Sequence, residues 1–171
     1  ICVVCGFVFV GILGNYLNDD VLPEAYYNME NANLDQTSFV YYVDEEGNIQ
    51  LLQQIHTSAD RQWASLDEIP EAMVEAAIAI EDKRFYDHRG VDWIRTIGVM
   101  IYGFEQGGST LTQQLIKNLT NDNEATFNRK FNEIIRALNL EKHYSKKEIL
   151  EAYLNTVSLG EGCYGVKTAA E

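Results

Sequence analysis

The stretch TFNRKFNEIIRALNLEKHYSKKEILEAYL, residues 126–154, decides the fold, because its apolar residues recur at the spacing of an α-helix. In its first half, the large apolar side chains form one stripe that we predict to be the core face of a long helix over residues 126–144: Phe127, Phe131, Ile134, Ile135 and Leu138. Ser145 is followed three residues later by Glu148, which is the pattern of a capping box and predicts a second helix running through Leu154.

Helical patterns continue upstream of this stretch. Residues 66–80 carry apolar residues at helical spacing, and Pro70 suits a first turn, so a helix should deliver Glu81 at its C-terminal end. Two more helices are expected within residues 91–104 and 109–119. The predicted fold class is therefore mainly α.

The N-terminal part of the chain has a different character. The β-prone runs Ser38–Val43 and Ile49–Ile55 flank a Gly-Asn turn and predict a hairpin. Residues 1–14 are apolar and uncharged, but a helix of that length spans roughly 21 Å against a hydrocarbon core of roughly 30 Å. We interpret them as a transmembrane signal-anchor cut within its own helix, with a buried core segment or a cleaved signal peptide as alternatives. The predicted units are this partial anchor, a connecting segment with the hairpin at 15–62, and a helical domain at 63–171.

The charge balance limits the ligands of this chain. Its 26 acidic and 13 basic residues give a formal net charge of -13, which argues against general nucleic-acid binding. An anionic ligand must therefore be met by a local basic cluster. The three cysteines, Cys2, Cys5 and Cys163, form neither a disulfide framework nor a zinc-binding pattern, so we predict no metal site from them.

Three segments concentrate the residue types that carry chemistry. The first is EDKRFYDHRG, residues 81–90, in which Glu81 leaves an apolar helix. Loss of hydration and the negative helix terminus both favour proton uptake by such a carboxylate, which suits a general base. The alternative is an ordinary solvated acid at a helix end.

The second segment is EQGGSTLTQQLIKN, residues 105–118. Backbone N–H groups at a helix start, together with the hydroxyls of Ser109, Thr110 and Thr112 and with Lys117, can receive a phosphate or a diphosphate. The order of residues is not that of a P-loop. The alternative is ordinary capping of the helix by Ser109.

The third segment is RKFNEIIRALNLEK, residues 129–142. Glu133 lies roughly 140° around the helix from the predicted apolar stripe at 100° per residue. It is therefore expected off the main core face, with Lys130 and Ala137 as its neighbours. A solvated ion pair is the alternative to a functional role.

Taken together, these segments resemble a known family. EDKRFYDHRG, GGSTLTQQLIKN, RKFNE, KKEILEAYLN and GEGCYGVKTAA are similar, in this order, to the five motifs of the glycosyltransferase family of class A penicillin-binding proteins and monofunctional peptidoglycan glycosyltransferases. The resemblance covers residues 63–171. It implies a lysozyme-like, two-lobed helical domain with a cleft between the lobes and a hydrophobic patch against the membrane. The chain stops within the fifth motif, so we expect the domain to be incomplete at its C-terminal end.

The resemblance also implies roles for individual residues. Glu81 would be the general base that deprotonates the 4-hydroxyl of the acceptor GlcNAc, and Glu133 would assist departure of undecaprenyl diphosphate from the donor MurNAc. Inversion would give a β-1,4 linkage. The residues implied around the substrate are Asp82, Phe85, His88, Ser109, Thr110, Gln113, Gln114, Lys117, Arg129 and Lys130.

One position departs from the family pattern. Several members carry Arg four residues before the Arg-Lys pair, where this chain has Ala125. We expect that another cation or a divalent metal, Mg²⁺ or Mn²⁺, compensates, or that activity is reduced; no obligate cofactor is expected. Steady-state rates of Ala125→Arg with and without magnesium test this, and unchanged rates in both conditions would reject compensation.

The implied partners are lipid II, the nascent glycan strand and the membrane, with a transpeptidase domain further along the parent protein and no nucleic acid. The implied location is the cell membrane, single-pass, with the catalytic domain outside the cytoplasm. The apolar stretch Thr96–Phe104 would contact the bilayer, or would form a core helix instead. The alternative functions are a muralytic glycosidase or lytic transglycosylase, and a non-catalytic glycan-binding scaffold.

Overall fold

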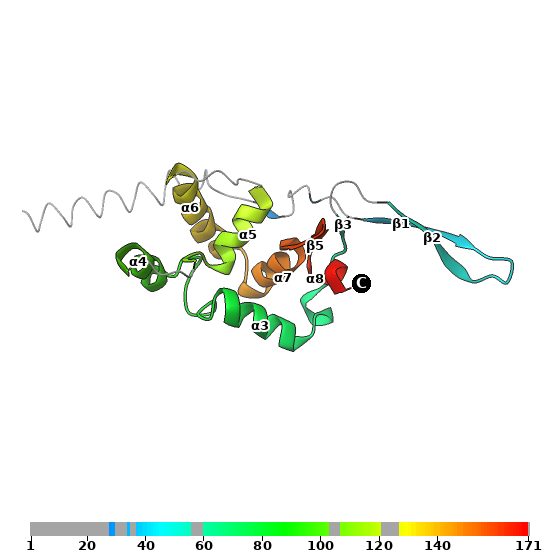
Figure 1. The fold of residues 1–171 in the computed structure, drawn as a ribbon, viewed down its shortest axis with the longest axis horizontal. Coiled ribbons are helices and arrows are strands. Elements are labelled where there is room, and N and C mark those ends of the chain that lie inside the picture. Colours follow the sequence, from blue (N-terminus) through cyan, green and yellow to red (C-terminus); the bar gives the residue numbers. More distant parts are fainter. Residues whose placement is uncertain are drawn as a thin grey trace, which may run out of the picture.

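The computed structural model describes residues 28–29, 34, 37–55, 60–102, 107–120 and 127–170. Along the chain, the elements are β1 (Ser38–Val43), β2 (Ile49–Ile55), β3 (Asp60–Arg61), the 3₁₀ helix η3 (Leu66–Glu68), α3 (Glu71–Glu81), α4 (Trp93–Tyr102), α5 (Leu111–Thr120), α6 (Phe127–His143), α7 (Lys146–Thr156), β4 (Ser158–Gly160), β5 (Cys163–Tyr164) and α8 (Val166–Ala170). The mainly helical class predicted from the sequence is confirmed, and the sheet of β1 and β2 stands apart from the helices (Figure 1).

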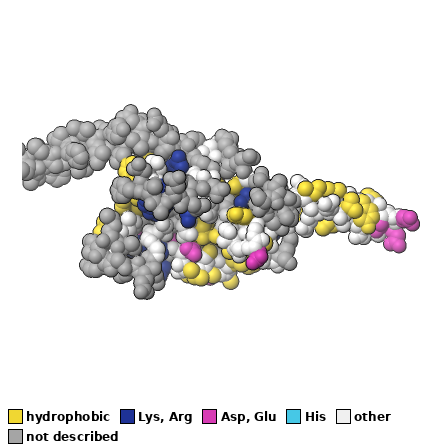
Figure 2. Space-filling model, turned by 45° about the horizontal axis from the view of Figure 1, so that its top comes forward, with side chains coloured by type: hydrophobic (Ala, Val, Ile, Leu, Met, Phe, Trp, Pro, Cys, Tyr) yellow, Lys and Arg dark blue, Asp and Glu magenta, His cyan; other side chains and the backbone are white. Residues whose placement is uncertain are grey.

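The predicted hairpin is present. β1 and β2 pair antiparallel, with Ser38 opposite Ile55 and Val43 opposite Ile49. In the turn, the backbone N–H groups of Glu46 and Asn48 donate to the carboxylate of Asp44 at 3.1 and 2.8 Å. The hairpin projects from the helical body at the end opposite α4 and α6 (Figure 1). Hydrophobic side chains lie exposed along it and acidic side chains occupy its tip (Figure 2).

The hydrophobic core lies where α5, α6 and α7 meet. α5 and α7 pack on each other, and α6 packs on α5. The largest fully buried apolar side chains of this core are Phe85, Leu111, Leu115, Ile116, Leu140, Ile149, Leu150 and Leu154. α3 covers the core less completely, since Val74, Ala77 and Ile78 are only partly buried against it.

α7 begins as the sequence predicts. The hydroxyl of Ser145 accepts from the backbone N–H of Glu148 at 3.3 Å, and the Glu148 carboxylate accepts from the backbone N–H of Ser145 at 2.7 Å. Near its C-terminal end, Asn155 is fully buried and binds the backbone of Ala64 through both ends of its amide. This amide joins α7 to the segment that leads into α3.

The predicted core stripe of α6 is wrong in part. Ile135 is buried, but Phe131 is 45% exposed and Leu138 is only partly buried. The face that packs inward instead contains Glu133, Ala137 and Leu140, which are spaced by four and three residues and so share one side of the helix. The stripe was assigned from the largest side chains, whereas the helix approaches its neighbours through the small Ala137.

Candidate functional site

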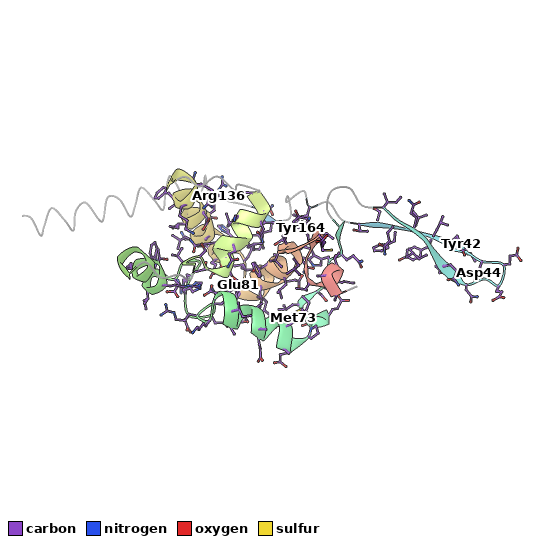
Figure 3. The ribbon with its side chains drawn as sticks, in the orientation of Figure 1. Tyr42, Asp44, Met73, Glu81, Arg136 and Tyr164 are labelled. Atoms are coloured by element: carbon purple, nitrogen blue, oxygen red, sulfur yellow. The ribbon has the colours of Figure 1, made fainter. Side chains whose placement is uncertain are left out.

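Glu81 is the last residue of α3, as predicted, and it is held by both its backbone and its side chain. Its carbonyl oxygen, one of the acceptors left free at a helix end, accepts from Nη1 of Arg95 at 2.6 Å. Its carboxylate accepts from Nε2 of Gln114 on α5 at 2.8 Å. The side chain is half-buried at the junction of α3, α5 and α7 (Figure 3).

Tyr153 on α7 completes this arrangement. Its hydroxyl donates to Oε1 of Gln114 at 3.5 Å. Burial raises the pKa of Tyr153 to about 12, and the negative charge of Glu81 adds to the effect. The phenol therefore stays neutral and donates, which leaves the amide N–H of Gln114 for Glu81. Sequence reasoning did not single out Tyr153, although it lies in the quoted segment KKEILEAYLN.

The turn after Glu81 is tied to the start of α5 by a buried acid. Asp82 is 1% exposed, and its carboxylate accepts from the backbone N–H of Leu111 at 3.0 Å and faces Nε2 of His88 at 2.9 Å. A negative charge at the N-terminus of a helix is stabilising. Phe85 packs under this turn, with Nζ of Lys146 4.3 Å from the centre of its ring. These contacts hold in place the turn that follows Glu81 at the end of α3.

Thr110 caps the start of α5. The alternative prediction from the sequence, a cap formed by Ser109, is wrong. The backbone N–H of Thr110 donates to Oε1 of Gln113 at 2.9 Å, and the backbone N–H of Gln113 donates to the hydroxyl of Thr110 at 3.2 Å. The Thr110 hydroxyl itself donates to the carbonyl of Gly90 at 2.6 Å. Ser109 is thereby left outside the cap, with its hydroxyl available to another group.

That group is the ammonium of Lys130, which donates to the Ser109 hydroxyl at 2.7 Å. The same ammonium pairs with Oε1 of Glu133, and Nη1 of Arg129 pairs with Oε2 of Glu133 at 2.6 Å. The ion pair with Lys130 that the alternative expected is present, but Glu133 is only 5% exposed, so its carboxylate is not solvated. It is a buried carboxylate held by two cations.

The two predicted catalytic carboxylates therefore approach the same segment. Glu81 bonds to Gln114 on α5, and Glu133 reaches Ser109, just before α5, through Lys130. Their surroundings differ, because Glu81 is bonded to a neutral amide and Glu133 to two cations. Such unlike environments allow two acids to take different roles in one reaction.

The other predicted site residues divide into two groups. Asp82, Phe85, Thr110 and Gln113 are buried, and His88 is nearly so, which suits positioning within the fold rather than contact with a ligand. Ser109, Gln114, Lys117, Arg129 and Lys130 keep part or most of their surface exposed. Ala125 and Glu105 lie outside the described residues.

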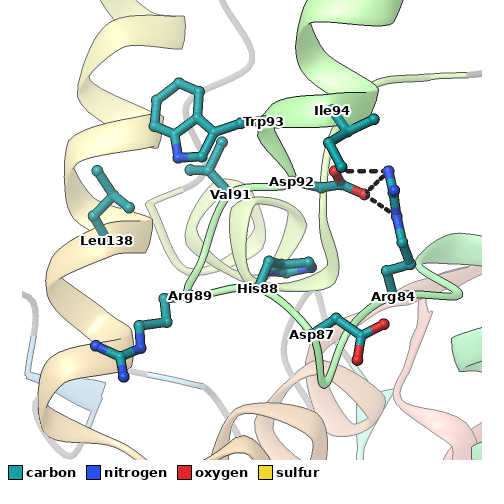
Figure 4. Close-up of a pocket in the computed structure, with 9 residues that line it drawn as sticks. All are labelled: Arg84, Asp87, His88, Arg89, Val91, Asp92, Trp93, Ile94 and Leu138. Carbon is teal, nitrogen blue, oxygen red and sulfur yellow. Dashed lines mark hydrogen bonds and ion pairs between the residues drawn. The ribbon is translucent and has the colours of Figure 1, made fainter.

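Two surface hollows lie next to these elements. A pocket of about 350 Å³ is lined by Arg84, Asp87, His88, Arg89, Val91, Asp92, Trp93, Ile94 and Leu138 (Figure 4). In it, Arg84 forms a two-pronged ion pair with Asp92, whose carboxylate also accepts from the backbone N–H of Arg95 at the start of α4. A smaller hollow between α5 and α6 is lined by Ile116, Lys117, Thr120, Arg129, Asn132, Glu133 and Arg136.

The surface of α4 is apolar where its side chains are described. Trp93, Ile94 and Ile97 are 51%, 74% and 51% exposed. The predicted membrane-contacting stretch begins here, but its side chains from Val99 to Phe104 lie outside the described residues. Within the described part of the chain, no helix is both long and apolar enough to cross a bilayer. Residues 1–14 lie outside that part, so the predicted anchor stays a prediction.

Two kinds of comparison with known proteins give matches for this chain. A family model described as "Transglycosylase" matches residues 47–171. The chain is 43% identical over 147 residues to "Penicillin-binding protein 1A" of Clostridium perfringens, covering 81% of this chain and 21% of that protein. It is 36% identical over 173 aligned positions to "Penicillin-binding protein 1F" of Bacillus subtilis, covering 96% of this chain and 22% of that protein. The chain thus spans about a fifth of the length of these relatives.

Proposed function

We propose that this chain, which belongs to the transglycosylase family, the peptidoglycan glycosyltransferase domain of class A penicillin-binding proteins, polymerises lipid II into β-1,4-linked glycan strands. The observation that carries the proposal is the attachment of Glu81 and Glu133 to one end of α5 in unlike surroundings. A glycosyl transfer needs a base for the attacking hydroxyl and a cationic group for the leaving diphosphate, and this arrangement offers both.

In the proposed reaction, Glu81 takes the proton of the 4-hydroxyl of the acceptor GlcNAc. The hydroxyl oxygen bonds to C1 of the donor MurNAc from the face opposite the diphosphate. The bond from C1 to the diphosphate oxygen breaks, its electron pair leaves with undecaprenyl diphosphate, and the configuration at C1 inverts. Glu133 holds Arg129 and Lys130 so that their charge faces the departing phosphates.

The setting of the reaction is also part of the proposal. We propose a lysozyme-like, two-lobed domain on the extracytoplasmic side of the cell membrane, held by a single-pass anchor at residues 1–14. The exposed apolar residues of α4 support contact with the bilayer, and the longer penicillin-binding relatives support a transpeptidase domain in the parent protein. No obligate cofactor is proposed, although Mg²⁺ or Mn²⁺ could accompany the diphosphate.

Incubation of the membrane-anchored protein with labelled lipid II tests the activity. We expect polymer from the wild type and a loss of about 10²–10⁴-fold in Glu81→Gln, the usual contribution of a general base. The matched control is Glu75→Gln, an exposed acid on the same helix, which should polymerise as the wild type does. Undiminished polymer from Glu81→Gln contradicts the proposal. Fragments released from added peptidoglycan would point instead to a muralytic enzyme. If neither polymer nor fragments form, the result would point to a non-catalytic scaffold.

A further inference from the structure

The hollow between α5 and α6 has a row of charged side chains along one of its walls. Arg129, Glu133 and Arg136 are spaced by four and three residues, so they form one stripe on α6. Lys117 and Thr120 line the hollow from α5. Arg136 lies near the middle of α6 and is partly buried (Figure 3).

The positive charge of this stripe exceeds its negative charge. The two carboxylate oxygens of Glu133 are already taken by Arg129 and Lys130. Across the described part of the chain, neither Lys117 nor Arg136 has an ion pair or a hydrogen bond to its side chain. Lys117 and Arg136 are therefore two cations of the hollow without a partner among the described residues, in a chain whose net charge is -13.

Two unpaired cations on one hollow favour an anionic ligand. Like charges held close together repel, and a half-buried cation without a partner loses hydration without regaining it in a hydrogen bond. An anion with several acceptor oxygens satisfies both requirements. The planar guanidinium of arginine suits this purpose because its paired N–H groups match two oxygens of a phosphate group.

We propose that Arg136 binds the diphosphate of the lipid-linked donor, together with Lys117 and Arg129, and that it helps to hold the leaving group as its charge develops. This inference rests on the proposed function for the identity of the ligand. It adds a residue that neither the sequence motifs nor the family resemblance indicated, because Arg136 became visible only as part of the stripe that faces α5. The ligand class is a lipid diphosphate.

Direct binding of inorganic pyrophosphate and of farnesyl diphosphate, measured by calorimetry on the full chain, tests the proposal. We expect Arg136→Ala to raise both dissociation constants about tenfold, the loss of one charge-assisted contact. The dissociation constants of Arg136→Lys should lie between those of Arg136→Ala and the wild type. Lysine keeps the charge but lacks the paired N–H groups of the guanidinium. Lys147→Ala, which removes an exposed cation on α7, is the matched control and should bind as the wild type does. Melting curves of all variants show whether the fold is kept.

The outcomes separate this inference from the proposed function. Equal pyrophosphate affinity in the wild type and in folded Arg136→Ala overturns the role of Arg136, even if lipid II is still polymerised. Affinity that depends on Arg136 in a chain that makes no polymer supports the anion site and removes the proposed function. In the polymerisation assay, Arg136→Ala should raise KM for lipid II, and an unchanged KM with unchanged diphosphate binding overturns the inference.

Discussion

At the scale of single residues, the amide of Gln114 joins two polar groups of the site, one on α3 and one on α7. Its N–H group faces Glu81 and its oxygen faces the hydroxyl of Tyr153. Because the pKa of Tyr153 is raised to about 12 by burial and by the charge of Glu81, the phenol remains a donor over the working pH range. Tyr153 therefore orients the amide that in turn positions Glu81.

Tyr153→Phe tests this orienting role. The hydrogen bond is long, so its loss should cost less than about 1 kcal/mol in the free energy of unfolding. Polymerisation should fall a few-fold, because Gln114 can then rotate. When Tyr153→Phe is added to Gln114→Ala, the polymerisation rate should fall little further, since the two residues act through one contact. Fully additive losses in the double variant, measured as log rates, would contradict the coupling.

Asp92 gives a prediction about pH. Burial acts to raise the pKa of Asp92, but the backbone N–H of Arg95 and the guanidinium of Arg84 outweigh it and hold the pKa below its ordinary value of 3.8. A lowered pKa in the folded state means that Asp92 stabilises the protein above the ordinary value and that this contribution is lost as pH falls through the folded-state pKa.

Asp92→Asn should therefore lower the free energy of unfolding at pH 7 by about 1–3 kcal/mol, the worth of hydrogen bonds to a charged group. The difference from the wild type should shrink below about pH 4. Urea unfolding at both pH values measures it. Asp87→Asn, which changes an exposed acid of the same pocket, is the control and should be nearly neutral at pH 7. A difference that stays constant with pH would reject the ion pair as its cause.

At the scale of elements, the position of α6 depends on a close contact between two small residues, Gly90 and Ala137. Gly90 has φ +86°, and a Cβ built on it would lie 2.5 Å from the carbonyl oxygen of Ala137. The turn that carries His88 thus rests on the backbone of α6. This contact sets which face of α6 points inward, and Glu133 lies on that face four residues before Ala137.

Gly90→Ala should destabilise the protein strongly. The left-handed backbone costs a non-glycine residue about 1–2 kcal/mol, and forcing a methyl group into a packed backbone costs about 1–3 kcal/mol more. Gly47→Ala is the matched control, because Gly47 also has φ +86° but has no atom within 4 Å of the added Cβ. Gly47→Ala should lower the free energy of unfolding only by the cost of the left-handed backbone. Equal melting temperatures for the two variants would show that the Gly90 contact is not tight.

These elements also show what can be predicted from the sequence. The caps and spacing predicted the hairpin, the arrival of α3 at Glu81 and the start of α7 at Ser145, because each depends on residues within a few positions of one another. The inward face of α6 and the cap at Thr110 depend on Gly90, which lies far away in the chain. Local patterns do not contain such contacts, and so Arg136 and Tyr153 were missed as well.

At the scale of the whole molecule, two of the exposed apolar surfaces in the described part of the chain lie at opposite ends. One is the hairpin, whose tip is acidic (Figure 2), and the other is α4 (Figure 1). Anionic lipid headgroups would repel the acidic tip. If the lipid-linked substrate enters from the bilayer, we therefore expect α4, and not the hairpin, to face the membrane.

The two tryptophans of the chain allow this orientation to be measured. Trp93 is half exposed on α4, whereas Trp63 lies between β3 and η3, and Figure 1 places α4 at the end of the helical body opposite β3. In Trp63→Phe, the remaining Trp93 should be quenched by brominated lipids in vesicles, since its ring suits the bilayer interface. In Trp93→Phe, the remaining Trp63, whose Nε1 donates to Glu151 at 3.1 Å, should be quenched far less. Equal quenching of both, or stronger quenching of Trp63, would mean that a different face of the molecule meets the membrane and that the exposed side chains of α4 serve another contact.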